Sequence, residues 1–434
     1  MWRLNNMLIM FRTKNFNSFK DDVVLDLRKT NYTQHRDHTF KCDNYDLLKT
    51  IAIYGANASG KSNLISAITK YSLFVIQQLY KDNDIDKKEN ENSLILANPF
   101  LLTNEINKEM EYEMVFYNNG YLFQYGYTIE EKIIRSEWLF VNDEQVFERN
   151  EDNIEFGEKY KEILQIYDKS RKDRLYIGVI DYFVSDKKIV NIMESFKSFF
   201  VLKLNIYTNI FLDVSVKGIY SDALKSSKIY EDDDLRKEVI KYVKKIDIGI
   251  KDILIDKRNL GYDNNEEKQL NISYAIHDVY NNDGEVIEEK SFDFNLESSG
   301  TIRFISIIED VILMLEHGGV FVVDELSSRL HPVITKFIID LFQSKVNINN
   351  AQLIFTTHDV SQMNKEQFRR DEIVLVDKNK QGISRIYALS DLDVRSDASF
   401  DKDYFKGKYG ALPIVKEFYD SEVNVDAKVK TKCK

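Results

Sequence analysis

One stretch of nine residues holds glycines, a lysine and a serine at a spacing that suits phosphate binding. It follows the apolar run at residues 50–54 and matches the pattern G-x-x-x-x-G-K-[ST]. The two glycines let the backbone curl so that its N–H groups face an anion, and the helix that follows favours the same charge at its N-terminus. We therefore predict a nucleotide-binding P-loop formed by Gly55, Ala56, Asn57, Ala58, Ser59, Gly60, Lys61, Ser62 and Asn63.

Two side chains of this loop would act on the phosphates directly. Lys61 would reach the β- and γ-phosphates as a point charge, and the Ser62 hydroxyl would bind Mg²⁺. The alternative is a glycine turn between a strand and a helix that binds nothing. Because the chain has only 16 glycines in 434 residues, a chance match to a glycine-dependent pattern is rare, and we favour the P-loop.

Two later apolar runs end in residues that could act on a bound nucleotide. Residues 319–325, GVFVVDE, have the form of a buried parallel strand that ends in two carboxylates. We predict Asp324 as a Mg²⁺ partner and Glu325 as the base or water-orienting residue for hydrolysis. A second run at residues 352–357 ends at His358, which could sense a γ-phosphate, although a lone histidine is more often structural.

Small hydroxyl residues and a glycine precede the apolar helix predicted over residues 304–315. The segment ESSGTIR contains Ser298, Ser299 and Gly300. A helix N-terminus of this kind leaves N–H groups available for a second anion, without a lysine of its own. Serine and glycine residues before a helix are also ordinary N-caps, so both interpretations stay open here.

The hydrophobic patterning predicts the elements that must position these residues. Two strands within residues 7–28 are expected beside the P-loop strand, and a helix is expected from Lys61 to about Tyr80, followed by a charged loop at 81–92. Helices are expected at 186–200 and 233–245, capped by Ser185 and Asp232. Further strands are predicted at 111–117, 121–129, 135–141, 250–255, 269–280, 286–294, 373–376 and 384–388.

Composition excludes several classes of protein. The fractions of 30% charged and 43% hydrophobic residues indicate a soluble globular chain, and its length indicates two or more lobes. No apolar run reaches the roughly 18 residues of a membrane span, so no membrane partner is expected. Two cysteines, Cys42 and Cys433, fit a cytoplasmic protein. The net charge of −11 disfavours a surface that is basic throughout, although Lys428, Lys430, Lys432 and Lys434 form a local basic patch.

The motifs and their order resemble those of a known family. GANASGKSN, ESSGT, FVVDEL followed by LHP, and TTHD follow one another as in ABC-type ATPases related to RecF, SMC and OLD proteins. The chain resembles more closely the AAA-15/AAA-21 group found in bacterial phage-defence and abortive-infection operons. This resemblance implies an α/β fold, an ABC-type P-loop NTPase core with a mixed sheet, an antiparallel β-subdomain and an inserted helical lobe.

The resemblance also implies roles for individual residues. Ser298, Ser299 and Gly300 would be the signature loop, which meets the γ-phosphate bound by another subunit. Residues 327–331 would be the D-loop at the dimer seam, and His358 the switch histidine. Three candidates for the Q-loop glutamine are poorly placed in the sequence, and none is assigned: Gln77, Gln78 and Gln124.

The function implied by the resemblance is that of a dimeric switch ATPase in antiviral defence. It would bind ATP and Mg²⁺, form a homodimer or higher homo-oligomer, and control a separate effector such as a nuclease or toxin. A RecF-like repair ATPase that binds DNA itself is the alternative, so nucleic acid remains a candidate partner. A transporter subunit is disfavoured by the helical insertion and the LHP turn, and a P-loop kinase or GTPase by the ESSGT and TTHD elements.

The sequence predicts three domain parts and no nuclease centre. Residues 1–158 would hold the P-loop and β-subdomain, 159–246 the helical lobe, and 247–434 the signature loop, the acidic strand and His358. The segment after Asp359 is too short for a further metal-binding domain once its two strands join the core sheet. We therefore interpret the Asp-x-Asp pattern of Asp391 and Asp393 as a solvated turn.

Overall fold

The central sheet carries the P-loop and the two strands predicted to face it. In the computed structural model, which describes residues 6–79, 98–167, 171–208, 229, 231–246, 249–263, 266–395 and 398–412, this sheet has the order β11-β15-β16-β5-β17-β18. Every neighbouring pair is parallel except β17 and β18. The strands are β5 (Thr50–Tyr54), β11 (Leu204–Tyr207), β15 (Val320–Val323), β16 (Gln352–Thr356), β17 (Ile373–Lys378) and β18 (Ser384–Ala388).

Helices cover both faces of this sheet. Alternate residues of β5 point to opposite faces: Ile51 and Ile53 pack in one core with helix α1 (Lys61–Leu79), and Ala52 and Tyr54 pack in another. The second core contains the apolar faces of α6 (Ser299–His317) and α7 (Pro332–Gln343). Because both faces are buried, β5, β15 and β16 are buried along their whole length, as their continuous apolar runs predict.

A second, antiparallel sheet packs its aromatic face on α1. Its order is β10-β9-β8-β7-β6-β1-β2, and α1 contributes Tyr71, which stacks on Tyr127 at 5.6 Å between ring centroids. The strands predicted at 111–117 and 121–129 are confirmed and form a hairpin, with Asn119 and Gly120 at positive φ in its turn. The strands are β1 (Met7–Lys14), β2 (Val23–Asp26), β6 (Glu109–Asn118), β7 (Tyr121–Glu130), β8 (Ile133–Val141), β9 (Glu144–Asn150) and β10 (Asn153–Phe156).

The prediction that β1 and β2 lie beside the P-loop strand is wrong. The two strands do pair with each other, but the other neighbour of β1 is β6. Both edges of β5 are occupied by β16 and β17, so no position beside it remains. A small two-stranded sheet of β3 (Thr39–Cys42) and β4 (Tyr45–Leu48) lies between β2 and β5 in the chain.

The segment predicted to be helical between residues 160 and 245 is interrupted by a strand. β11 pairs in parallel with β15 at the edge of the central sheet, and it follows directly on the helical stretch that ends at Lys203. Asp232 does cap α5, but α4 is capped by Asp186, not Ser185, because Asp186 accepts the N–H groups of Lys188 and Ile189. The helices are α2 (Lys161–Leu164), α3 (Tyr176–Phe183), α4 (Lys187–Ser198) with a π-turn at Phe199–Lys203, and α5 (Asp233–Ile246).

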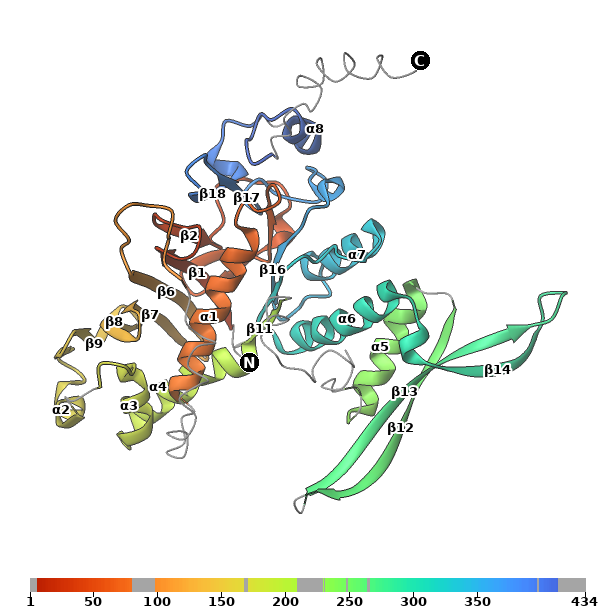
Figure 1. The fold of residues 1–434 in the computed structure, drawn as a ribbon, viewed down its shortest axis with the longest axis horizontal. Coiled ribbons are helices and arrows are strands. Elements are labelled where there is room, and N and C mark those ends of the chain that lie inside the picture. Colours follow the sequence, from red (N-terminus) through yellow and green to blue (C-terminus); the bar gives the residue numbers. More distant parts are fainter. Residues whose placement is uncertain are drawn as a thin grey trace, which may run out of the picture.

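Three long strands form an arm that projects from α5 and α6 (Figure 1). They are β12 (Ile250–Asp263), β13 (Glu266–Tyr280) and β14 (Val286–Asp293), in the order β12-β13-β14. The predicted strands over residues 250–294 are confirmed, and β12 is longer than predicted. A short helix, α8 (Phe400–Phe405), follows β18. These elements confirm the predicted fold class, while the domain boundaries at residues 158 and 246 stay predictions. The basic patch, the loop at 81–92 and Cys433 lie outside the described residues.

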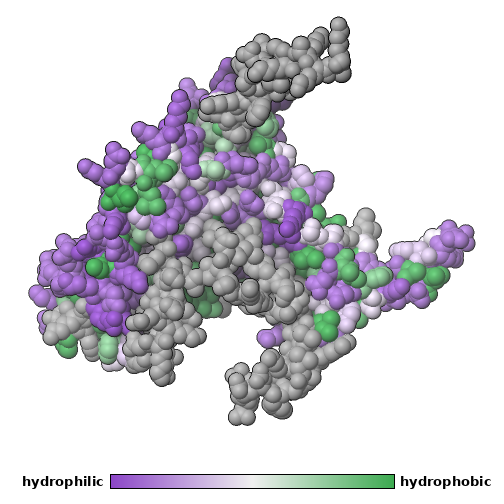
Figure 2. All heavy atoms as spheres, in the orientation of Figure 1, coloured by the Kyte–Doolittle hydropathy of each residue, from purple (hydrophilic) through white to green (hydrophobic). Residues whose placement is uncertain are grey.

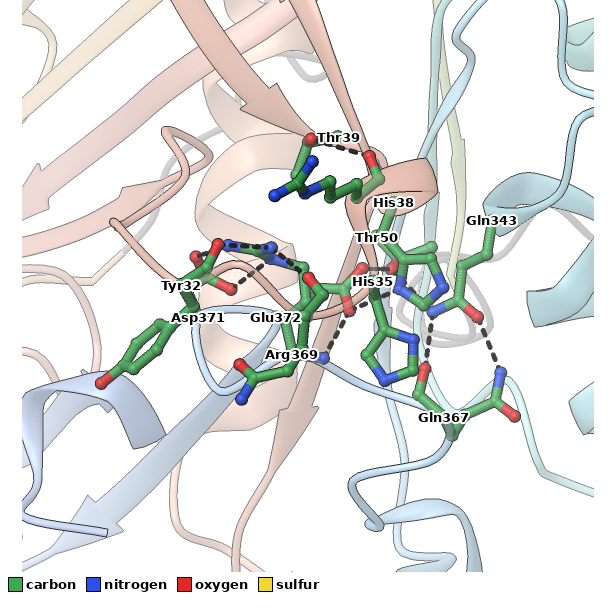
Figure 3. A network of polar contacts seen from close by, with 12 residues as sticks. Tyr32, His35, His38, Thr39, Thr50, Gln343, Gln367, Arg369, Asp371 and Glu372 are labelled. Atoms are coloured by element: carbon green, nitrogen blue, oxygen red, sulfur yellow. Dashed lines mark hydrogen bonds and ion pairs between the residues drawn. The ribbon is translucent and has the colours of Figure 1, made fainter. Parts of the chain in front are cut away.

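A buried polar network connects residues 34–38 to the end of the central sheet where β5 and β17 begin (Figure 3). Glu372, which is fully buried, accepts hydrogen bonds from Thr50 of β5, from the backbone N–H of Arg369 and, at 2.9 Å, pairs with His38. Arg369 binds both oxygens of Asp371 at 2.8 Å and donates to the carbonyl of Gln34. The network therefore joins two segments that are far apart in the sequence, residues 34–38 and residues 369–372, at the start of the P-loop strand.

We predict that Arg369→Ala lowers the free energy of unfolding by about 3–5 kcal/mol, because Asp371 would remain as an unpaired buried charge. The side chains of Arg369 and Asp371 are only 1% and 3% exposed. The matched control is Arg385→Ala, which removes an ion pair to Asp377 from an arginine that is 72% exposed, and its effect should stay within about 1 kcal/mol. Urea unfolding followed by circular dichroism measures both, and equal effects of the two variants would contradict the prediction.

Candidate functional site

The two glycines of the P-loop are required by their backbone angles and by their neighbours. Gly55 has φ 155° and Gly60 has φ 119°, a region that favours glycine. A Cβ atom on Gly55 would lie 2.3 Å from the carbonyl oxygen of Val376. A Cβ on Gly60 would lie 2.7 Å from the Ser384 hydroxyl. Either substitution would therefore displace the loop from the sheet.

Lys61 is folded back onto its own loop. Its ammonium group donates to the carbonyl oxygens of Gly55 at 2.8 Å and Ala56 at 3.0 Å. The residue is 5% exposed, and burial lowers its pKa to about 8, against the opposing effects of Asp324 and Glu325. A polyphosphate would offer this ammonium a full negative charge in place of two carbonyl dipoles.

Asp324 lies beside Ser62 and is fixed by a threonine that the sequence analysis missed. The Ser62 hydroxyl donates to Asp324 at 3.3 Å, and the Thr356 hydroxyl donates to the same carboxylate oxygen at 2.6 Å. Thr356 also accepts the backbone N–H of Glu325 at 2.7 Å. One hydroxyl on β16 thus fixes both acidic residues at the end of β15. The sequence pattern TTHD predicts a role for His358 only. Nothing in it indicates the hydrogen bonds of Thr356 to Asp324 and Glu325.

Glu325 and His358 face each other across the mouth of the site. Their side chains are 43% and 42% exposed, and His358 Nε2 lies 3.9 Å from a Glu325 oxygen. His358 Nδ1 lies 3.5 Å from the Lys61 ammonium. Burial and the charge of Lys61 lower the pKa of His358 below 6.5, so its imidazole is neutral at pH 7. Its Nδ1 can therefore accept a hydrogen bond from the Lys61 ammonium.

These residues line one open cavity of about 710 Å³. The structure therefore brings together the P-loop, Glu325 and His358, three sites predicted from separate parts of the sequence. It adds Lys378 at the end of β17, which the sequence analysis did not single out. The lining residues are Asn57, Ala58, Ser59, Gly60, Lys61, Ser62, Asn63, Glu325, His358 and Lys378.

Two serines outside the P-loop form hydrogen bonds that hold the loop in place. Ser18, in the turn after β1, accepts from Asn63 at 2.7 Å. The Ser384 hydroxyl, at the start of β18, donates to the Ser59 carbonyl at 2.5 Å and can accept from the Ser18 hydroxyl, which lies 2.8 Å away. The role of Ser18 could not be deduced from the sequence because its contacts are distant in the chain.

The predicted signature loop is not part of this cavity's lining. Ser298 is the N-cap of α6 and accepts the Thr301 N–H at 3.1 Å, whereas Ser299 and Gly300 form the first turn, whose N–H groups have no partner within the helix. A Cβ on Gly300 would lie 2.9 Å from the Arg329 carbonyl. The signature loop and the predicted D-loop at 327–331 are therefore neighbours in the same chain.

The structure does not place a Q-loop glutamine at the site. None of the three candidates lines the cavity, and Gln124 is hydrogen-bonded to Glu113 in the antiparallel sheet. Within the described parts of the chain, no cluster of three or more His, Cys, Asp or Glu side chains could hold a metal ion. No helix among those same residues is long and apolar enough to cross a membrane.

Comparisons with known proteins identify the family. No curated protein matches the chain. Among solved structures, the SMC head domain from Thermotoga maritima is 15% identical, with a TM-score of 0.41 over 89% of this chain and 99% of that chain. An Smc head domain with an extended coiled coil, bound to the C-terminal domain of ScpA and derived from Pyrococcus furiosus, is 15% identical, with a TM-score of 0.42 over 93% and 99%.

One family matches the sequence directly. It is described as "AAA domain, putative AbiEii toxin, Type IV TA system", and it matches residues 51–364. This range runs from the P-loop strand past His358 and covers well over half of the chain. The chain therefore belongs to this AAA-domain family, which confirms the AAA-21 resemblance inferred from its motifs.

Proposed function

We propose that this chain binds and hydrolyses ATP with Mg²⁺ as a dimeric switch in antiviral, abortive-infection defence, and that it controls a separate effector. Lys61, Ser62, Glu325 and His358 line one cavity, and Asp324 is hydrogen-bonded to Ser62 beside it; this convergence carries the ATPase part of the proposal. Membership of an AAA family supports the same chemistry. The family description, which names a toxin–antitoxin system, supports the role in defence.

The residues at the cavity fit a Mg²⁺-bound nucleotide. Mg²⁺ prefers oxygen ligands and is held by one or two protein groups together with phosphates and water. Ser62 and Asp324 supply two such oxygens 3.3 Å apart. Ser62 and Asp324 would hold Mg²⁺ there, and the ion would neutralise charge on the phosphates.

The chain's own groups then have separate tasks in hydrolysis. The P-loop N–H groups and Lys61 hold the phosphates, which are charged in both ground and transition state. Glu325 projects into the cavity mouth and accepts a hydrogen bond from the attacking water. The neutral His358 can donate from Nε2, the ring nitrogen that Lys61 does not contact, toward the terminal phosphate.

A second copy of the chain is needed to complete the site. The signature loop at Ser298–Gly300 lies beside Arg329 and outside the cavity of its own chain. A two-fold dimer would place each signature loop over the nucleotide held by the other copy, which creates two equivalent composite sites. ATP would thereby control association, and association would be the signal that reaches the effector.

The first prediction separates binding from turnover. Lys61→Ala should weaken ATP binding at least about tenfold because it removes the charged phosphate contact, whereas Glu325→Gln should keep the affinity and lower kcat by roughly 10²–10⁴-fold. Isothermal titration and a phosphate-release assay measure the two effects. An equal loss of affinity in both variants would refute the assigned roles.

The second prediction concerns the composite site. Glu325→Gln should accumulate as a dimer or higher assembly when ATP and Mg²⁺ are present, because hydrolysis no longer dissolves it. Adding Ser298→Arg to that variant should prevent the assembly, since a bulky cation would occupy the place of the signature loop, while ATP binding to each copy stays intact. Sedimentation velocity distinguishes the assembled variant from the monomeric one. If Glu325→Gln stays monomeric with ATP and Mg²⁺, the composite site is refuted.

The third prediction tests the role in defence. Bacteria that carry this gene together with its neighbouring genes should resist phage infection, and Lys61→Ala should abolish the protection because the switch can no longer be loaded. Plaque counts on matched strains measure the effect. Full protection by this gene alone would show that no separate effector is needed, and protection by the Lys61→Ala strain would exclude an ATP-driven switch.

A further inference from the structure

The strand β14 forms the outer edge of the projecting arm and is exposed along its whole length. Every one of its residues, Val286–Asp293, is exposed to solvent. The sheet order places β13 on one side of it and, among the described residues, no strand on the other. Figures 1 and 2 show the arm reaching away from the body, with hydrophobic patches among hydrophilic ones. An open edge of unpaired N–H and C=O groups is a template for another strand.

The side chains of β14 divide into two faces. The Lys290 ammonium lies 5.5 Å above the centre of the Phe292 ring, which places these two residues on the same face with Glu288. Glu289 lies on the opposite face, where it forms an ion pair with Lys251 of β12 at 2.8 Å. A bulge at Ile287 interrupts the alternation before Glu288, so Val286 does not share the face of Glu288. The face that holds Lys290 therefore carries the order Glu, Lys, Phe from residue 288 to residue 292.

Symmetry restricts how two copies of this edge could pair. A two-fold axis that makes two identical edges antiparallel must run perpendicular to the sheet, so each face continues across the junction as the same face. Residues directly opposite each other in an antiparallel pair also share a face. The axis must therefore run midway between the two copies of one residue of β14. Each register is named below by that residue, and only a few registers remain.

One of these registers matches the side chains. With the axis at Glu289, Glu288 lies opposite Lys290 of the second copy, and this pair occurs twice. An axis at Glu288 would oppose two glutamates. An axis at Lys290 would oppose two lysines and place Glu288 against Phe292. Opposite charges are thus matched only with the axis at Glu289.

The two glutamates that meet on this axis each have their own cation. Lys251 contacts Glu289 and Asp278 at 2.8 Å, so a neutralising ammonium accompanies each Glu289 carboxylate. We propose that β14 pairs with β14 of a second copy in this register, which joins the two arms into one continuous antiparallel sheet. This interface uses no nucleotide and would link copies independently of the composite ATP site.

Cysteine cross-linking tests the register. The background is Cys433→Ser in the full-length chain without nucleotide, and the other cysteine, Cys42, is buried. Glu289→Cys should form a disulfide-linked dimer under mild oxidation, because opposite Cα atoms in an antiparallel pair are about 4.5–5.5 Å apart. Ser291→Cys, two positions away on the regular part of the strand, should not, since in this register the two copies of Ser291 lie on either side of the axis and do not face each other.

Charge reversal tests the complementarity. Glu288→Lys and Lys290→Glu should each weaken self-association at least about tenfold, because each places two pairs of like charges across the junction. A mixture of the two variants should associate again, since every cross-strand pair is then opposite in charge. The double variant Glu288→Lys/Lys290→Glu should also associate. Sedimentation equilibrium without nucleotide measures all four samples.

Two outcomes would overturn the proposal. Cross-linking of Ser291→Cys as fast as that of Glu289→Cys would show random collision. A wild-type chain that stays monomeric, with no rescue in the mixed charge variants, would leave this edge for a strand of another protein. Repeating the cross-linking in Lys61→Ala separates this interface from the proposed switch, because the disulfide should form equally well in a chain that does not bind ATP.

Discussion

The parallel pairing of β5, β16 and β15 is the constraint on which the site depends. The register sets Ile53 beside Thr356 and Phe355 beside Val323, so the three strands end together at one edge of the sheet. The P-loop, the acidic pair and His358 begin just beyond those ends. The Thr356 hydroxyl fixes the acidic pair to the strand that carries His358, because it binds Asp324 and the Glu325 backbone N–H.

The charges of the site are arranged for an anion. Lys61 is desolvated and donates to two carbonyl groups, and the lowered pKa follows from that loss of solvation. The pKa of the neighbouring His358 is lowered by burial and by the charge of the same lysine, so the neutral imidazole adds a donor and no second positive charge. A phosphate chain bound at the P-loop would offer this ammonium a full negative charge. The cavity is therefore shaped and polarised for an anionic ligand.

The sequence predicted what depends on local pattern and missed what depends on distant contacts. Gly55, Gly60 and Lys61 follow from a local motif, and the buried strand of Asp324 follows from a continuous apolar run. The place of β1 could not be predicted, because an alternating strand fits any half-buried sheet and only the competition for the edges of β5 excludes it. β11 is four residues long within a helical context, and its strand form comes from pairing with β15. Ser18, Ser384 and Thr356 act through partners far away in the sequence, so no local signal marked them.

Mixing two inactive variants tests the composite site most directly. Lys61→Ala keeps an intact signature loop, and Ser298→Arg keeps an intact P-loop, so a heterodimer of the two contains one complete site. Phosphate release by an equimolar mixture should recover to a measurable fraction of the wild-type rate, because only the mixed dimer holds a complete site, one of its two. Neither variant alone should show turnover. A mixture as inactive as its components, although the two chains form dimers, would contradict a site shared between copies.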